Sequence, residues 1–385
     1  MSLRKKEGDE QAMASLQMDQ DTARRLFAAG GVLLLLDLPK QSEFGVDCNA
    51  WTIGPKFKGL KMIPPGLHLI YVSAASKEGH LAPRVAFFHN FREKEVLVKK
   101  WDSKNEELIA EDDLEIVNRF RLNLLNLDPF LAPYPFQNHR RWYSLSYDLN
   151  EQLVGRLQPA NKLLSSQAEF ISKEFDELGE SSMKVDRQHP TRIRYSDKQG
   201  LPILLYKEGT EVRFTSIPTP RDDVCSIAER TERGADSSYA LQSVLASFQN
   251  PNEILGELQF AFICFLLVHM YEGFEQWKLL IHLLCNCLKD LEKNERLFLD
   301  FIMVLHYQLK FVPKELFVDI VSKNNFLSVE LANFFDIVNE CERCPVLKEK
   351  ARKFHCFLIK NYRWDFKVDD DYKPVIVDSE QHHLS

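Results

Sequence analysis

The chain has 385 residues, of which 45% are hydrophobic, and its formal net charge at pH 7 is −7. This length favours two domains, and the hydrophobic content is ordinary for a globular protein with a sizeable core. The acidic balance argues against a protein that coats nucleic acid with its whole surface, because such domains are usually basic.

The cysteines and the apolar runs indicate the compartment. Several of the eight cysteines lie within apolar runs, which is typical of reduced, buried thiols. The longest apolar run, residues 260–268, is too short to span a membrane, and residues 1–20 lack the apolar core of a secretion signal. The sequence therefore predicts a soluble intracellular protein.

The first part of the chain predicts a β-rich domain over residues 18–158. Residues 1–17 are polar and are expected to form a disordered extension, and residues 21–28 are expected to be helical. The apolar run Gly31–Leu36 predicts a buried strand, and alternating apolar residues continue at intervals up to Val98. The close spacing of strands and turn residues predicts an antiparallel β-sandwich or small barrel.

A loop dense in turn formers lies within this domain. Between Trp51 and His68, glycines and prolines alternate with apolar anchors, and the segment has no nucleophile or acid–base pair. Glycine and proline favour special backbone angles, so we expect a rigid, specifically shaped loop between strands. The loop either turns a corner of the sandwich or presents Lys56, Phe57 and Lys58 to a partner.

Two flanking helices are predicted before the pattern weakens. An apolar stripe through Phe120 predicts a helix that ends at the turn of residues 133–135. Asp148 is expected to cap the next helix. Residues 159–234 are rich in Ser, Gly, Pro and charge, and they predict a partly disordered linker with a short strand at residues 212–214.

Residues 235–367 predict an all-α domain. Residues 250–253 have the pattern of a helix start, with an Asn cap followed by Pro. Gly273 is expected to separate that helix from the next, whereas Pro313 and Pro345 are expected to open later ones. Six or seven helices with short loops predict an antiparallel bundle or a short right-handed superhelix. The expected fold class is therefore α+β, with a β-sandwich or barrel-like domain followed by a helical bundle or superhelix.

The sequence predicts no catalytic, cofactor-binding or metal-binding residue. Cys341 and Cys344 have the spacing of a zinc or redox pair, but the surrounding pattern is helical and apolar, and packed thiols near helix ends are preferred. Histidines on apolar helices, such as His282, are more typical of hydrogen-bonded core or boundary residues. Phosphate-binding loops, dinucleotide fingerprints and hydrolase motifs do not occur. We therefore expect a binding protein rather than an enzyme.

Three other segments have two interpretations each. Residues 139–143 interleave cations with aromatics and could stack on RNA, but a helix or strand edge with a buried Trp142 is favoured. Trp364, at the end of the last predicted helix, is either an exposed anchor or packed. Residues 368–385 are expected to be a flexible tail, whose β-branched segment 374–377 either adds as a strand to a partner's sheet or folds back on its own domain.

Several motifs, taken together, resemble the A1-alpha-2 repression family of splicing factors. In chain order they are residues 43–47, 54–59, 62–68, 133–135, 209–214, 255–262 and 363–366. The resemblance extends from about Met18 to Val377, and residues 1–17 and 159–208 match it poorly. It implies a β-rich domain followed by a helical one, as the periodicity also predicts.

The resemblance implies a non-enzymatic chaperone of U5 small nuclear ribonucleoprotein assembly, in the cytoplasm and the nucleus. The implied partner is the large core scaffold protein of that particle, bound at its RNase H-like and Jab1/MPN-like domains, so that helicase and RNA bind later. We expect a monomer without direct contact with nucleic acid or membrane. The alternative is an adaptor of another pathway, such as membrane trafficking, because superhelical bundles of this length also serve there.

The resemblance also implies that the C-terminal tail adds as a strand to the partner. The expected partner-binding residues are Pro374, Val375, Ile376, Val377, Trp364, Lys56, Phe57 and Lys58.

Overall fold

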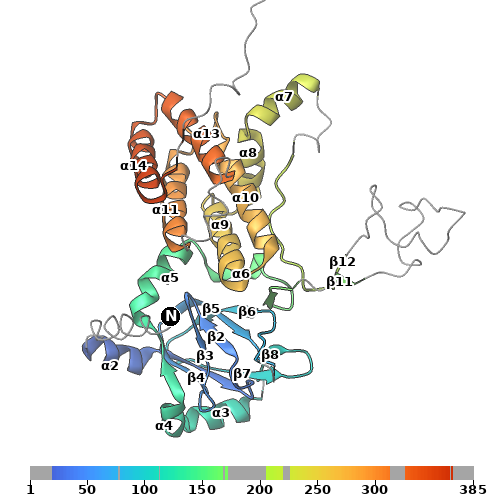
Figure 1. The fold of residues 1–385 in the computed structure, drawn as a ribbon, viewed down its shortest axis with the longest axis vertical. Helices are drawn as coiled ribbons and strands as arrows, with labels where there is room; N and C mark the ends of the chain where they lie inside the picture. The colour runs from blue at the N-terminus through green and yellow to red at the C-terminus, as the bar shows by residue number, and fades with distance from the viewer. Residues whose placement is uncertain are drawn as a thin grey trace, which may run out of the picture. The chain divides into compact units, whose positions relative to one another are not determined.

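The computed structural model describes residues 20–76, 79–111, 113–167, 170–171, 205–219, 226–312, 326–364 and 366. The chain divides into two compact units (Figure 1). The first unit is formed by residues 1–216 and 252–277, and the second by residues 217–251 and 278–385. The units are therefore interleaved along the chain. The expected α+β class is confirmed, whereas the predicted serial domain boundaries stay a prediction.

Two five-stranded sheets form the first unit's framework. One sheet has the order β8-β7-β1-β4-β9, with β1 (Gly31–Leu36), β4 (Gly59–Ile63), β7 (Val96–Asp102), β8 (Glu107–Ala110) and β9 (Leu131–Pro133). The other has the order β10-β6-β5-β2-β3, with β2 (Glu43–Val46), β3 (Asn49–Thr52), β5 (Gly66–Ser73), β6 (Val85–Phe91) and β10 (Leu164–Ser165). A separate two-stranded sheet pairs β11 (Phe170–Ile171) with β12 (Leu205–Tyr206).

The predicted antiparallel arrangement is corrected at two strand pairs of one sheet. β1 pairs with β7 in parallel, and β4 pairs with β9 in parallel. Between β1 and β7 the chain builds most of the other sheet before it returns, so β7 re-enters beside β1 in the same direction. Alternation of apolar residues predicts that a strand exists, but it does not specify the direction of its neighbour.

Both faces of the mixed sheet are buried. Leu33 and Leu35 of β1 belong to a core shared with Phe44, Ile70 and other residues of the second sheet, so the two sheets pack face to face. Leu34, between them, lies in a second cluster on the opposite face. This double burial explains why β1 is a continuous apolar run rather than an alternating one.

Helices complete the first unit. They are α2 (Gln20–Ala29), α3 (Leu114–Leu122), α4 (Leu124–Leu127), η1 (Asp128–Phe130), η2 (Phe136–Asn138), α5 (His139–Ser146), α6 (Glu151–Leu157) and α9 (Glu253–Ile263). Some lie against the mixed sheet and others, such as α6, against β6 of the second sheet. Partly buried side chains of α3 and α4 pack on the second cluster. The helix predicted through Phe120 breaks at Asn123, because that residue leaves helical geometry, and the chain forms β9 before residue 135.

Two predicted helix boundaries are also corrected. Asn150, rather than Asp148, caps α6, since its Oδ1 accepts the amide proton of Leu153 at 2.8 Å. α9 continues as a π-helical segment, Cys264–Val268, which ends at His269 in the left-handed conformation (φ 65°). Gly273 lies within the next helix, α10 (Tyr271–Cys285). A Cβ there would come within 2.7 Å of the Ala261 carbonyl oxygen, so glycine allows the two helices to pack closely.

The second unit is helical in its described part. Its helices are α7 (Ile227–Ala235), α8 (Ser238–Ala246), the C-terminal part of α10, α11 (Glu295–Phe311), α13 (Phe326–Glu340) and α14 (Pro345–Tyr362). α14 packs against both α11 and α13 (Figure 1). The predicted start at Pro345 is confirmed, whereas the helix predicted at Pro313 lies outside the described residues. None of the described helices combines the length and the apolar character that crossing a membrane requires.

Candidate partner-binding site

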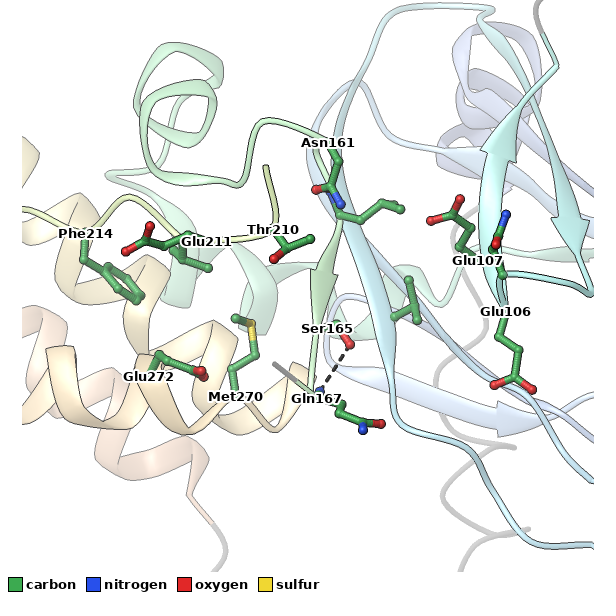
Figure 2. A pocket seen from close by; sticks show the side chains of 14 residues that line it. Glu106, Glu107, Asn161, Ser165, Gln167, Thr210, Glu211, Phe214, Met270 and Glu272 are labelled. Atoms are coloured by element: carbon green, nitrogen blue, oxygen red, sulfur yellow. Dashed lines mark hydrogen bonds between the residues drawn. The ribbon is translucent and has the colours of Figure 1, made fainter. Parts of the chain in front are cut away.

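The first unit contains a pocket of about 250 Å³, built from segments far apart in the sequence (Figure 2). The turn between β7 and β8 contributes residues 105–107, and β10 with its flanks contributes residues between 161 and 167. An extended segment, residues 209–215, and the start of α10 form the other side. We call residues 209–215 the strap.

Strand geometry directs β10 side chains into this pocket. Ser165 pairs with Val85 of β6, so these two side chains lie on the same face of the sheet. Leu163 and Gln167, two residues away in either direction, also line the pocket, whereas Leu164 points the other way and is fully buried. The Ser165 hydroxyl oxygen accepts the Gln167 amide proton at 3.2 Å and fixes the end of the strand (Figure 2).

Arg213 fastens the strap to the end of α6. Its Nη2 donates to the carbonyl oxygens of Gly155 at 2.7 Å and Gln158 at 2.8 Å. The last carbonyls of a helix have no partner within the helix, so this cation both satisfies them and complements the helix dipole. The side chain beside it, Phe214, packs edge-on against Phe260 of α9, with 6.0 Å between ring centroids.

Glu257 fastens the strap to α9. Its carboxylate is fully buried and accepts two hydrogen bonds from Thr215, from the amide at 2.7 Å and from the hydroxyl at 2.6 Å. Gln276 of α10 donates a third at 2.9 Å, and Nη2 of Arg156 lies 3.5 Å away. A buried carboxylate is tolerated only when it is paired and hydrogen-bonded, and these partners meet that condition. The strap is thus held rigidly beside the pocket.

The pocket lining is acidic. Four of its 14 lining residues are glutamates, namely Glu106, Glu107, Glu211 and Glu272, and none is Lys, Arg or His. Within the described part of the chain, Glu106, Glu107 and Glu211 form no ion pair, and Figure 2 shows Glu107 on one side with Glu211 on the other.

A second, more open depression of the same unit differs in charge. It is lined by residues of both signs, and two of its three carboxylates have hydrogen-bond partners within the depression: Glu95 bonds His89 at 2.8 Å, and Glu151 accepts from Asn90 at 2.9 Å. Its charges therefore compensate one another, so the acidic pocket has the stronger unbalanced field.

The loop of residues 51–68 is shaped by the core beneath it. At Gly59 the backbone has φ +141°, and a Cβ would come within 1.9 Å of the Leu33 carbonyl oxygen, so only glycine fits. Phe57 packs on Phe44 with ring centroids 5.1 Å apart, whereas Lys56 and Lys58 are exposed. Of these three predicted contact residues, the lysines are accessible and Phe57 mainly contributes packing.

His68, at the end of this loop, belongs to a buried polar network. Its Nδ1 lies 2.8 Å from Asp47 Oδ2, and its Nε2 lies 2.9 Å from the Pro64 carbonyl oxygen. Tyr134 donates to Asp47 Oδ2 at 2.6 Å, and the Leu69 amide donates to Oδ1 at 3.0 Å. Both ring nitrogens of His68 therefore lie within hydrogen-bond distance of an oxygen atom.

The network is structural in character. Asp47, His68 and Tyr134 are at most 3% exposed. Burial and the neighbouring Asp47 raise the pKa of Tyr134, while burial and then the charge of His68 lower the pKa of His139 beside it. Their hydrogen bonds join the turn after β2, the start of β5 and the segment after β9.

Comparison with known proteins shows the family to which the chain is related. Residues 29–159 match the model of the AAR2 N-terminal domain, and residues 214–367 match that of the AAR2 C-terminal repeat region. The protein AAR2 homolog of Caenorhabditis elegans is 40% identical over 356 residues, covering 89% of this chain and 97% of that protein. The human homolog is 37% identical over 378 residues, covering 95% and 98%.

The chain belongs to the AAR2 family. This is the family of splicing factors that the sequence motifs indicated.

The family motifs meet in space at the two features described above. Asp47, His68 and Tyr134 come from three separate motifs and form one network. Arg213 and Phe214 come from a fourth and secure the strap. The motif sequences were visible, but their convergence was not, because these bonds join residues up to 87 positions apart.

The other predicted site residues have different surroundings. Trp364 is 5% exposed and packs between Tyr362 and Phe366 in the second unit, so it is a core residue rather than an exposed anchor. Trp142 is likewise buried and donates to the Leu67 carbonyl at 2.8 Å, as the favoured interpretation of residues 139–143 predicted. Pro374, Val375, Ile376 and Val377 lie outside the described residues.

Cys341 and Cys344 lie in the connection between α13 and α14. Cys344 is buried and immediately precedes Pro345 at the start of α14, while Cys341 follows α13. Burial, and then the hydrogen bond with Cys341, raise the pKa of the Cys344 thiol to about 12. Among the described residues, no group of three or more His, Cys, Asp or Glu side chains is arranged to hold a metal ion.

Proposed function

We propose that this splicing factor is a non-enzymatic assembly chaperone of the U5 small nuclear ribonucleoprotein. It binds the large scaffold protein of that particle at its RNase H-like and Jab1/MPN-like domains and delays the binding of helicase and RNA. Family membership across both matched regions, together covering most of the chain, carries the proposal. The chain acts as a monomer in the cytoplasm and nucleus, without direct contact with nucleic acid.

Two structural observations support a role in binding. The buried carboxylates at the family motifs, such as Asp47 and Glu257, accept hydrogen bonds that stabilise the neighbouring segments. The accessible features, by contrast, are suited to recognition: an acidic pocket and two exposed lysines, Lys56 and Lys58.

Co-purification tests the partner. The full chain is co-expressed with the two scaffold domains, separately and together, and isolated through a tag. Stoichiometric recovery of the scaffold domains is expected. If the tagged chain instead retrieves vesicle-coat or cargo proteins from cells and leaves the scaffold behind, it is an adaptor of another pathway and the proposal fails.

The tail provides a second test. We expect removal of residues 372–385 to weaken scaffold binding by about tenfold or more, because strand addition contributes several main-chain hydrogen bonds and pockets for alternate side chains. Calorimetry with the purified scaffold domains measures the change, and a scrambled tail of the same composition is the control. Equal affinity of the full and shortened chains would remove strand addition from the proposal.

A further inference from the structure

We infer that the acidic pocket of the first unit receives one arginine side chain presented by a partner protein. The inference rests on the proposed function only in that the partner is a protein; the pocket itself is argued from its size, its lining and its charge.

The size fits a single long side chain. Pockets for drug-sized ligands and cofactors occupy about 300–1,000 Å³. At about 250 Å³ this one lies below that range. A single side chain with a flexible stem and a compact head group has a volume that such a pocket can hold.

The lining fits an amphipathic cation. Leu163, Val212 and Met270 provide apolar walls against which the methylene groups of a stem can pack. Phe214, an aromatic residue with which a cation can interact, also lines the pocket. Glu107 and Glu211 lie on opposite sides of the pocket, as Figure 2 shows.

The charge selects the class of partner. Because Glu106, Glu107 and Glu211 form no ion pair within the described residues, a cation entering the pocket supplies the missing counter-charge. The same carboxylates repel phosphate, which disfavours nucleic acid. Arginine is preferred over lysine because its planar fork can donate to carboxylates on two sides and stack on an aromatic ring.

The rigid strap supports a preformed receptor. Bonds of Arg213 and Thr215 fix the strap on either side of Phe214. Gly209 at its other end accepts from the Asn161 amide at 3.2 Å, so the walls that the strap forms do not have to be ordered when the ligand binds. Preorganisation lowers the entropy cost of binding and thereby favours recognition of even one side chain.

A peptide titration tests the pocket directly. The probe is acetyl-Gly-Arg-Gly-amide, added to the full chain with labelled methionine methyl groups and followed by NMR. We expect the Met270 methyl signal to shift saturably with this peptide. The citrulline peptide, neutral and nearly isosteric, is expected to give no shift. An unresponsive Met270 signal, or an equal response to citrulline or lysine peptides, would overturn the inference.

Charge-neutral variants provide the matched comparison. Glu107→Gln with Glu211→Gln is expected to weaken the arginine peptide by about fivefold to tenfold, since two charge-assisted contacts are lost. Glu342→Gln, an exposed glutamate of the second unit, removes the same kind of charge elsewhere and should leave the titration unchanged. Equal weakening by both would indicate only a general charge effect and would also overturn the inference.

The two proposals fail separately. If the scaffold domains bind but the arginine peptide gives no saturable shift of the Met270 signal, the pocket inference falls and the proposed function stands. If the scaffold does not bind at all, the proposed function falls, while the peptide titration still decides whether the pocket takes arginine.

Discussion

A single carboxylate joins three segments of the first unit. Asp47 lies in the turn between β2 and β3, His68 lies on β5, and Tyr134 follows β9. Each side chain is conspicuous in the sequence only as part of a local motif. Their joint role depends on distances that the chain sets when it folds, so the sequence predicted the motifs but not the network.

Removing Asp47 should be severe. Asp47→Ala leaves the buried Tyr134 hydroxyl and Leu69 amide without their acceptor, and we expect a loss of about 3–5 kcal/mol in the free energy of unfolding. Tyr134→Phe removes one hydrogen bond and should cost about 1–2 kcal/mol. Urea titration followed by circular dichroism measures both. The exposed Tyr143→Phe is the control, and an Asp47→Ala variant as stable as wild type would show that the network contributes nothing.

Three glycines of the loop of residues 51–68 differ in how an added side chain would be tolerated, because backbone strain and steric clash occur in different combinations. At Gly54 an added Cβ meets nothing within 4 Å; at Gly66 it meets nothing but φ is +135°; at Gly59 φ is +141° and the Leu33 carbonyl blocks it. Alanine should therefore be near neutral at Gly54, cost about 1–2 kcal/mol at Gly66, and cost about 3 kcal/mol or more at Gly59. Thermal and urea unfolding measure the three losses of stability. A different order of the three variants would contradict the prediction.

Among elements, the sequence predicted those whose pattern is local. β1 is recognisable because both its faces are buried, and α14 because Pro345 marks its first turn. β10 was missed because it has two residues and is defined by pairing with β6. The helix break was assigned to Gly273 rather than His269, because a glycine that allows close helix packing has the same sequence appearance as one that ends a helix.

Contact between α10 and α13 should depend on pH. His282 Nδ1 and Glu330 Oε1 lie 2.8 Å apart, and this hydrogen bond raises the pKa of His282 above its ordinary 6.5. The folded state then binds more protons than the unfolded state between the two pKa values. The stabilisation is complete below pH 6.5 and is lost as pH rises through the folded value.

The variant Glu330→Gln isolates this contribution. We expect the stability difference between wild type and Glu330→Gln to shrink as the pH rises from about 6 to about 8. The effect should be small, because more than half of the His282 side chain is exposed. Urea unfolding at a series of pH values measures it. A difference that is constant or that grows with pH would contradict the assignment.

At the scale of the whole molecule, the two units do not follow each other in order. The sequence predicted a β-rich part and a helical part, but α9, which is helical and apolar throughout, belongs to the β-rich unit. Its membership depends on contacts such as Phe260 stacked on Phe88 of β6, with centroids 5.4 Å apart. Helical periodicity has no information about which unit a helix joins.

Hydrogen exchange should report this membership. We expect the amides of α9 to open with the same free energy as those of β5 and β6, within about 1 kcal/mol, because they form one cooperative unit. Phe260→Ala should lower both by about 3–5 kcal/mol. Leu122→Ala, at a side chain that is 85% exposed, is the control. Protection lost in α9 but retained in β6 would show that the helix is independent.

The interleaving of the two units also determines when the first unit can complete its folding during translation. A chain emerging from the ribosome exposes the sheets of the first unit well before residues 252–277 have been translated. The helix that covers the outer face of β6 is translated about 160 residues later, which takes roughly 10–30 seconds at typical elongation rates. During that interval Phe88 and its neighbours are uncovered, so the nascent chain should be a client of ribosome-associated chaperones until Trp277 has emerged.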